Sequence, residues 1–384
     1  MIAYEDVTVW HAATPEPVAA RIAIGGDFLP AGNLIMPPEF DWGKQAKQLD
    51  QYFKDVGTTF VNLEGTLDTR QLRPRALLGL GQIVSAPPSS LEYLKSIRCG
   101  AIGIANNHSC DFGDEGVAHT KAASALYDMV SIGAGITLKE TPDIFVWRGP
   151  DTMRVGFWAA AKATSDQATA NRRGVEPCRI ERGTQALETM RSQGAQCCVA
   201  LIHAGCMRNN QPDPEDVRLL ESLAQSGFDI VAASHSHRIA GHKQLRLAHD
   251  RNAFCFFGLG SIVSGYVSSP LEREGLVIVA SLNASGGLVA LETHPVLLDA
   301  AGFGSIPSES NREIILQRFR KLSAELADGS YEKHFYRETS TGLTRLYVRD
   351  AQAAFRAAGL RGLARKAARV RVRHMKRLIR KVTG

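Results

Sequence analysis

Ala101-Ile-Gly-Ile-Ala-Asn106-Asn-His-Ser-Cys-Asp111-Phe-Gly113 begins as a short apolar run and ends in a cluster of polar side chains. The apolar run predicts a buried strand, and the cluster brings amide, imidazole and carboxylate groups directly after it. In α/β proteins, functional side chains gather at the carboxyl ends of strands. This stretch therefore predicts an α/β sheet with a site at the end of one strand.

Four other apolar runs end in the same kind of residue. Asp27 follows residues 21–24, Asn62 and Glu64 follow residues 58–61, His203 follows residues 197–202, and His235 and His237 follow residues 229–232. One strand that ends in a carboxylate is common, because such residues also make turns. Five strand ends with oxygen or imidazole groups predict one shared cavity.

Helical stretches separate several of these runs, at about 43–56, 89–97, 115–128, 181–193 and 214–226. The last of them begins Asp213-Pro214-Glu215, which is typical of an N-cap with proline in the first turn. Alternating strands and helices predict a mixed α/β domain.

Aspartate, glutamate, asparagine and neutral histidine together favour a metal site for Mn²⁺, Fe, Zn²⁺ or Co²⁺ over Ca²⁺ or a thiolate zinc site. In Ser234-His235-Ser236-His237, alternate side chains can lean towards one cavity. Two metal ions about 3.5–4 Å apart, bridged by one carboxylate, are able to activate water against a phosphoryl or acyl centre.

The order of these motifs resembles the CapA (poly-γ-glutamate capsule synthesis) family of the calcineurin-like metallophosphoesterase superfamily. The resemblance runs from about residue 19 to residue 268, and Asn106 to Gly113 is its most specific part. It implies a four-layer α/β/β/α sandwich of two mixed sheets, with metals at the sheet edges. To this fold the present sequence adds a basic C-terminal helical tail, which its charge distribution predicts.

Carried over by motif, the resemblance also implies the metal ligands. Glu64 takes the bridging position, Asn107, His203 and His235 complete one site, and Asp27 and His237 hold the other. One departure bears on the second site. Ordinary metallophosphoesterases have Asp-x-His in the first motif, and Asp27-Phe28-Leu29 has no such histidine.

His108 and Asp111 are the catalytic candidates. The resemblance implies that His108 stands beside the substrate as a general acid or as a stabiliser of negative charge. Asp111 fixes His108, holds a turn or binds metal directly, and Asn62 is expected to orient a ligand. Lys162, Arg172 and Arg173 either line the site and meet an anionic substrate or belong to an ordinary solvated loop.

The resulting expectation is a hydrolase-type enzyme that depends on one or two divalent ions, with Mn, Fe or Zn favoured. Its substrate is an anionic small molecule or polymer with a phosphoester or an amide/acyl bond, and by resemblance it acts in capsule, poly-γ-glutamate or other cell-envelope polymer synthesis. Two alternatives stay open: a metal-assisted amide-forming or acyl-transfer enzyme, and a non-catalytic assembly factor for a membrane-bound synthase.

The composition predicts a cytoplasmic protein. Seven cysteines without C-x-x-C spacing favour reduced thiols. The first ten residues contain the acid pair Glu5-Asp6 and no basic segment before an apolar one, which argues against a secretory signal. No apolar run reaches the roughly 18 residues that a transmembrane helix needs.

The charge is concentrated at the C-terminus. Ten lysines and arginines lie between 361 and 381, more than the net charge of +6, so the rest of the chain is mildly acidic. We expect a CapA-like domain over 1–300, an extension packed on it over 301–350 and a basic amphipathic helical tail over 351–384. Three roles of the tail stay open: it docks on the rest of the chain, it binds an anionic membrane or a membrane synthase, or it binds nucleic acid. The tail has no aromatic residues between its basic ones, which argues against nucleic-acid binding.

Overall fold

Two mixed β-sheets face each other in the computed structural model, which describes residues 8–14, 16–34, 36, 40–75, 83–162, 164, 166–248 and 251–339. The chain divides into a unit of residues 1–327 and a unit of residues 328–384. In the second unit, residues 331–339 are helical. The predicted boundaries at 300 and 350 stay predictions, and the tail over 351–384 lies outside the described residues.

The first sheet is nine-stranded within the described residues. Its main path runs β1 (Thr8–His11), β18 (Leu288–Leu298), β17 (Glu274–Leu282), β2 (Ala20–Gly32), β3 (Thr58–Leu63), β6 (Cys99–Gly103) and β7 (Val130–Ile132). β16 (Ser261–Gly265) also pairs with β2, and β19 (Gly304–Ser305) with β18. Strands β2, β3, β6 and β7 are parallel, so their carboxyl ends share one edge.

The second sheet is six-stranded within the same residues. It runs β14 (His242–Arg246), β15 (Asn252–Phe256), β13 (Ile230–Ser234), β12 (Cys197–His203), β10 (Arg154–Ala161) and β9 (Ile144–Arg148). Its four inner strands are parallel and its outer two are antiparallel. Two short pairs lie apart from it: β4 (Thr66–Leu67) with β5 (Ser85–Ala86), and β8 (Ala134–Ile136) with β11 (Gly174–Val175).

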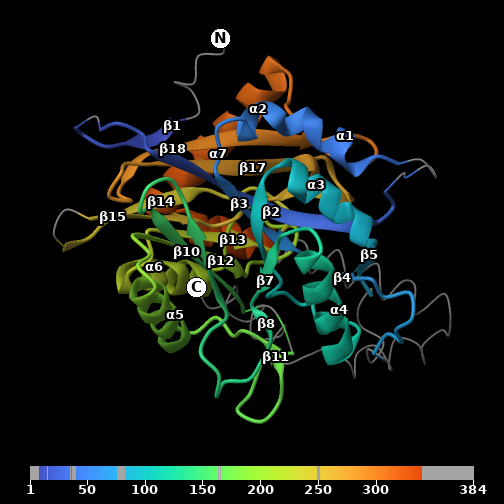
Figure 1. Cartoon of the computed structure of the whole chain (residues 1–384). Coiled ribbons are helices and arrows are strands. Elements are labelled where there is room, and N and C mark those ends of the chain that lie inside the picture. The colour runs from blue at the N-terminus through green and yellow to red at the C-terminus, as the bar shows by residue number, and fades with distance from the viewer. Residues whose placement is uncertain are drawn as a thin grey trace, which may run out of the picture. The chain divides into compact units, whose positions relative to one another are not determined.

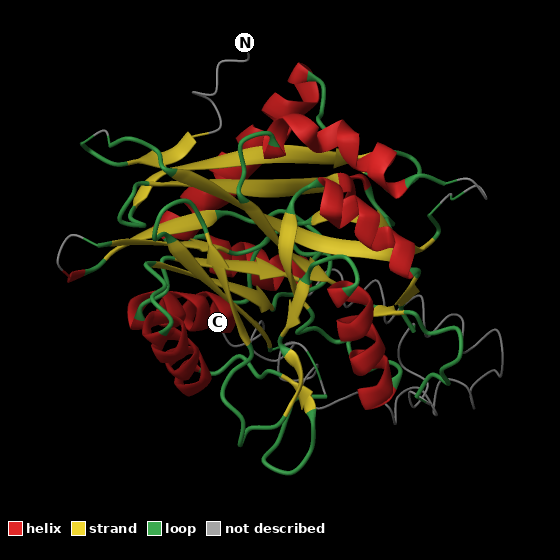
Figure 2. Ribbon diagram, in the orientation of Figure 1, coloured by secondary structure: helices red, strands yellow, loops and turns green. Residues whose placement is uncertain are grey.

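Helices cover the outer faces of both sheets (Figures 1 and 2). Beside the first sheet lie α1 (Trp42–Ala46), η2 (Lys47–Leu49), α2 (Asp50–Phe53), η3 (Pro88–Ser90), α3 (Leu91–Ser96) and α4 (Gly113–Ala125). On the second sheet, α5 (Ile180–Ser192) contacts β10, and α6 (Pro214–Ser226) contacts β13 and β15. The turn η5 (Pro270–Arg273) precedes β17, and α7 (Glu309–Asp328) follows the last strands. The predicted α/β sandwich of two mixed sheets is confirmed.

Local sequence signals explain the best-defined helix. At the start of α6, the side chain of Asp213 accepts a hydrogen bond of 3.0 Å from the backbone N–H of Glu215, and Pro214 fills the first turn. At its end, Gly227 has a φ of 139°, which glycine adopts at little cost. These two ends fix where β13 begins and thus where its carboxyl end lies.

The core lies between the two sheets. The rings of Phe60 on β3 and Phe157 on β10 are 5.1 Å apart in an edge-on contact. At Gly103 an added Cβ would lie 3.2 Å from the Cβ of Ala159, so this glycine lets the sheets approach closely. Among the helices that the structure describes, none combines the length and the apolar composition of a membrane span.

Candidate metal centre

Residues on or directly after strands of both sheets bring the predicted ligands together, although the strand predicted to end before Asp27 continues to Gly32. Asp27 lies within β2, where the register against β3 shifts, and Glu64 directly follows β3. His203 is the last residue of β12, and His235 follows β13. Because β2 and β3 belong to one sheet and β12 and β13 to the other, the centre lies between the two sheets.

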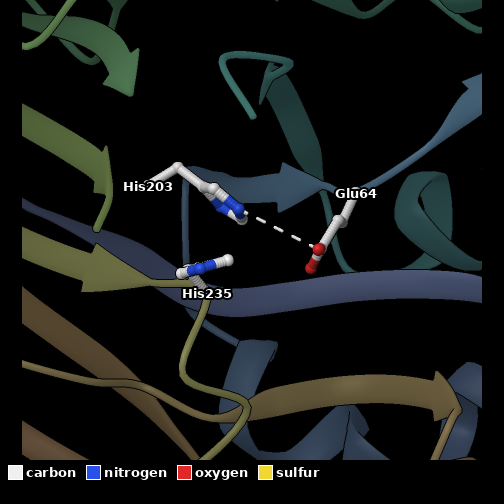
Figure 3. Close-up of side chains that lie close together, drawn as sticks. All are labelled: Glu64, His203 and His235. Atoms are coloured by element: carbon white, nitrogen blue, oxygen red, sulfur yellow. Dashed lines mark ion pairs between the residues drawn. The ribbon is translucent and has the colours of Figure 1, made fainter. Parts of the chain in front are cut away.

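Two groups of side chains share Glu64. One consists of Glu64, His203 and His235, the other of Asp27, Glu64 and His237, and within each group the potential ligand atoms lie within 4.8 Å of one another. Oε1 of Glu64 is 3.9 Å from Nε2 of His203, and Oε2 is 3.7 Å from Nε2 of His237. Figure 3 shows the Glu64 carboxylate facing the rings of His203 and His235.

Three asparagines surround these groups. Oδ1 of Asn107 lies 2.7 Å from Nε2 of His203, which places it as a further oxygen beside the first group. Asn62 donates a hydrogen bond of 2.8 Å to Oδ1 of Asp27, and its Nδ2 lies 3.3 Å from Nδ1 of His203. Asn106 donates to the carbonyl of Leu63 at 2.7 Å and so ties the end of β6 to β3. Asn62 and Asn106 orient the candidate ligands.

The His-x-His turn has an unusual backbone. His235 and His237 have φ angles of 92° and 55°, a region that residues other than glycine seldom adopt. The N–H of His235 donates to Oδ2 of Asp27 at 3.1 Å, and this bond helps to hold the turn. Such strain persists where the surroundings impose it, and it is concentrated at functional sites. The turn directs both rings at Glu64.

His108 lies at the edge of the centre and Asp111 lies behind it. Nδ1 of His108 is 2.8 Å from Oδ2 of Asp111, and Nε2 is 3.9 Å from Oε1 of Glu64. Oδ2 of Asp111 also accepts a 2.8 Å hydrogen bond from the backbone N–H of Val84. The structure therefore places Asp111 next to His108 and not among the two ligand groups.

Burial shifts the pKa values of the candidate ligands. Burial, together with the neighbouring imidazoles, lowers the pKa of His203 well below its usual value and that of His235 to about 4. Burial raises the pKa of Glu64, partly offset by His237. Burial alone would lower the pKa of His237, but Glu64 and Asp27 together raise it. His203 and His235 are neutral at pH 7, the form that binds metal.

The donors fit divalent metal ions. Oε2 of Glu64 and Nδ1 of His235 are buried and have no hydrogen-bond partner among the described residues. Nδ1 of His237 lies 3.1 Å from Oδ2 of Asp27, without the alignment of a hydrogen bond. Buried polar atoms are normally paired, so unpaired ones call for a missing partner. Mixed oxygen and imidazole donors suit Mn, Fe and Zn.

A cavity of about 250 Å³ opens onto the centre. Glu64, His108 and His237 line it, and so do Arg208 and Glu272, which sequence reasoning missed. Arg208 follows His203 by five positions in the chain, and that proximity is the one available signal. Nothing in the sequence singles out Glu272.

Lys162, Arg172 and Arg173 lie elsewhere. Lys162 forms an ion pair with Asp216. Arg172 and Arg173 border a different cavity of about 240 Å³, beside Arg75 and Asp166. None of the three lines the cavity over the candidate centre.

The fold and the site define an α/β sandwich protein with a candidate two-metal centre between its sheets. The chain belongs to a family described as "Bacterial capsule synthesis protein PGA_cap", whose model matches residues 21–266. These residues include every predicted ligand from Asp27 to His237.

Curated relatives are similar at low identity. The "Capsule biosynthesis protein CapA" of Bacillus anthracis is 24% identical over 187 residues, which are 47% of this chain and 44% of that protein. A "probable polyglutamine synthesis accessory protein" of Mycobacterium tuberculosis is 26% identical over 285 residues, covering 69% of this chain and 72% of that protein. The chain thus spans less than half of the B. anthracis protein.

Solved structures resemble the chain more weakly. The calcineurin-like phosphoesterase YfkN of Bacillus subtilis has a TM-score of 0.48 and 13% identity, over 81% of this chain and 99% of that one. A 5′-nucleotidase precursor of Thermus thermophilus has a TM-score of 0.47 and 12% identity, over 79% of this chain and 58% of that one. Scores at this level say nothing of activity.

Proposed function

We propose that this chain is a divalent-metal-dependent hydrolase, acting on a phosphoester or an amide/acyl bond in the synthesis of capsule, poly-γ-glutamate or another cell-envelope polymer. The observation that carries the proposal is the position of Glu64, shared by two buried groups of ligand atoms. Membership of a capsule synthesis family supports the biological setting. The centre would hold one or two ions, with Mn, Fe or Zn favoured by its donors.

The residues divide into ligands and supports. Asn107, His203 and His235 would hold one ion with Glu64, and Asp27 and His237 would hold the other. A bound divalent ion would supply Lewis acidity, which would polarise the phosphoryl or carbonyl oxygen of the substrate and make water more acidic for the attack. Asn62 keeps Asp27 and His203 in place through hydrogen bonds of 2.8 and 3.3 Å.

His108 would handle the proton. Its Nδ1 faces the Asp111 carboxylate at 2.8 Å, so Nδ1 carries a hydrogen and Nε2 is left towards the cavity. With Nδ1 held by Asp111, Nε2 would serve a leaving group or a developing negative charge in the cavity.

The test is hydrolysis after metal loading. The full chain is stripped with chelator, reloaded with Mn²⁺, Fe²⁺ or Zn²⁺, and given aryl phosphodiesters, aryl phosphomonoesters and γ-glutamyl anilides in parallel. We expect turnover with one metal and one bond type, abolished by chelator and by Glu64→Gln. A folded wild-type protein that takes up none of the three metals on titration overturns the proposal.

A second candidate is a non-catalytic assembly factor. The observation in its favour is that Leu29, which stands where a first-motif histidine would, lines the cavity as an apolar residue. One relative is also named an accessory protein. Complementation of polymer synthesis in cells separates the two: a Glu64→Gln chain that restores polymer as well as wild type does supports the assembly role and contradicts the enzyme.

Location and contacts belong to the same proposal. All seven cysteines lie in the described part of the chain as thiols and not as disulfides, and six of them are buried, Cys206 being half-buried. This supports a cytoplasmic setting. We place any contact with an anionic membrane or a membrane synthase at the basic residues 361–381. Cell fractionation of the full chain and of a chain with these charges neutralised tests it, and equal membrane association of both would refute it.

A further inference from the structure

The cavity over the candidate centre contains one permanently charged cation. Among the described residues that line it, Arg208 is the sole arginine or lysine, alongside Glu64, His108 and His237. Its side chain is 56% exposed, so the guanidinium is accessible to a ligand. Arg208 therefore offers a second point of attachment in the same cavity as the candidate ligands.

The backbone fixes Arg208 relative to the metal ligands. The N–H of Arg208 donates a hydrogen bond of 2.9 Å to the carbonyl of Ser236, the residue between His235 and His237. Arg208 also has a φ of 63°, a left-handed conformation that an arginine seldom adopts without an imposed constraint. The turn that carries two imidazole ligands thus also sets the position of this arginine.

A buried glutamate orients the guanidinium. Oε1 of Glu272 lies 3.3 Å from Nε of Arg208 and 3.7 Å from Nη2 of Arg238, and only 3% of Glu272 is exposed. Oε2 of Glu272 accepts a hydrogen bond of 2.7 Å from the N–H of Ser268. Glu272 belongs to neither ligand group. Glu272 therefore connects the segment after β16 with the loop after β12, and its contact with Arg208 is made to the Nε atom of the guanidinium.

The charges define the ligand. An arginine that is engaged at Nε still presents its two Nη groups, whose parallel N–H bonds match the two oxygens of a carboxylate. Glu272 balances one of the two positive charges of Arg208 and Arg238, so a single positive charge is left at this position, and a monoanion fits it better than a dianionic phosphate would. Leu29, Val84 and Met207 give the same cavity an apolar lining, which suits the short carbon chain between two polar groups.

We infer that Arg208, positioned by Glu272, binds a carboxylate of the substrate beside the bond held at the candidate metal centre. This inference rests on the proposed function for the identity of the reacting bond. It assigns to the cavity a substrate with two polar ends: a cleavable acyl or phosphoryl group and a carboxylate a few bonds away. Arg208 determines specificity, and Glu272 is a positioning residue.

The experiment compares two probes that differ only in the carboxylate. N-acetyl-γ-glutamyl anilide and its α-carboxamide counterpart are titrated by calorimetry into metal-free and Mn²⁺-loaded full-length protein. The variants are Arg208→Gln, Arg208→Lys and Glu272→Gln. Arg320→Gln is the matched control, because Arg320 is also half exposed, forms an ion pair with Glu313 at 3.4 Å, and does not line the cavity. Metal content is measured on every sample.

We expect Arg208→Gln to bind the carboxylate probe about 10- to 100-fold more weakly, the worth of one charge-assisted pair, and to bind the carboxamide probe as wild type does. Arg208→Lys recovers part of the loss, Glu272→Gln loses less than Arg208→Gln, and Arg320→Gln changes nothing. All variants keep the metal content of wild type.

Three results overturn the inference: equal affinity of wild type for both probes, equal loss of both probes in Arg208→Gln, or no measurable binding of the carboxylate probe. Inorganic phosphate and acetate are also tested as competitors of the carboxylate probe. If phosphate binds more tightly than acetate and displaces the probe only in proteins that keep Arg208, the position belongs to phosphate and the inference is wrong. Failure of the proposed function looks different: metal or turnover is absent while the Arg208-dependent preference for carboxylate remains.

Discussion

At the scale of single residues, Glu64 is the group on which both candidate metal sites depend. Its two oxygens face different histidines, Oε1 towards His203 at 3.9 Å and Oε2 towards His237 at 3.7 Å. A glutamine keeps the shape of this side chain and removes its negative charge. The substitution therefore separates the role of the shared carboxylate from simple packing.

We predict that Glu64→Gln lowers the metal content to less than about a tenth of wild type, whereas His235→Ala and His237→Ala each weaken one group and spare the other. The physical reason is that a neutral amide is a poor bridge between two cations. Elemental analysis by mass spectrometry on protein purified without chelator measures it. Full metal content in Glu64→Gln would show that the carboxylate is not a ligand.

A second residue-scale prediction concerns Asp111. Because Oδ2 of Asp111 lies 2.8 Å from Nδ1 of His108, we expect the Nδ1–H form of His108 in wild type. Asp111→Asn removes the carboxylate and with it this preference, while metal content stays unchanged. Nitrogen-15 chemical shifts of labelled histidines report the protonated nitrogen. A His108 signal that is the same in both proteins contradicts the prediction.

At the scale of elements, sequence patterns locate a helix well when its own ends define it. Residues 214–226 are predicted as helix and form α6, because Asp213 and Gly227 cap it locally. Residues 43–56 are predicted as one helix, but η2 interrupts them. There the carbonyl of Gln48 accepts a 3.3 Å hydrogen bond from the N–H of Ile306, a distant contact that no local pattern reveals.

The packing of α7 on β14 gives a prediction about pH. The ring of His242 stacks between Phe256 and Phe319, at 5.6 and 5.2 Å, and its Nδ1 lies 2.9 Å from the hydroxyl of Ser323. Burial lowers the pKa of His242 to about 4. In the unfolded chain it titrates near its usual value of 6.5.

Between pH 6.5 and pH 4 the unfolded chain therefore binds a proton that the folded chain refuses, so the contribution of His242 to stability is complete above pH 6.5 and is lost as pH falls. We expect His242 to account for about 1 to 3 kcal/mol of the decrease in the free energy of unfolding over this pH range. Urea unfolding of wild type and His242→Gln at several pH values measures this contribution, as a steeper dependence of the free energy of unfolding on pH in wild type. Parallel pH profiles would contradict it.

At the scale of the whole molecule, the motifs predict the sandwich and the candidate ligands, but not the rest of the cavity. Asp27, Glu64 and His203 follow or end short apolar runs in the sequence and so carry a local signal. Arg208 lies in the loop after β12 and Glu272 in the turn η5, far apart in the sequence, and only the folded chain brings Nε and Oε1 of these residues to 3.3 Å. Contacts between loops have no periodicity, so sequence patterns do not reveal them.

The centre draws its ligands from both sheets, which leads to the last prediction. Asp27 and Glu64 come from the first sheet and His203, His235 and His237 from the second, so an ion held by these candidate ligands would tie the two sheets together. Folding then creates the site, and metal binds the folded state in preference to the unfolded one. Free metal at about 100 times its Kd raises the free energy of unfolding by about 2.7 kcal/mol. For a domain of this size we expect Tm to rise by roughly 3 to 8 °C.

Differential scanning calorimetry with Mn²⁺ or Zn²⁺, and again after chelation, measures this rise. Glu64→Gln should unfold at the same temperature with and without metal, since it lacks the shared carboxylate. A control with Arg320→Gln should keep the full rise, because that side chain lies outside the cavity. A rise of equal size in Glu64→Gln would mean that the stabilising ion binds elsewhere, and that the two sheets are held together by their apolar core alone.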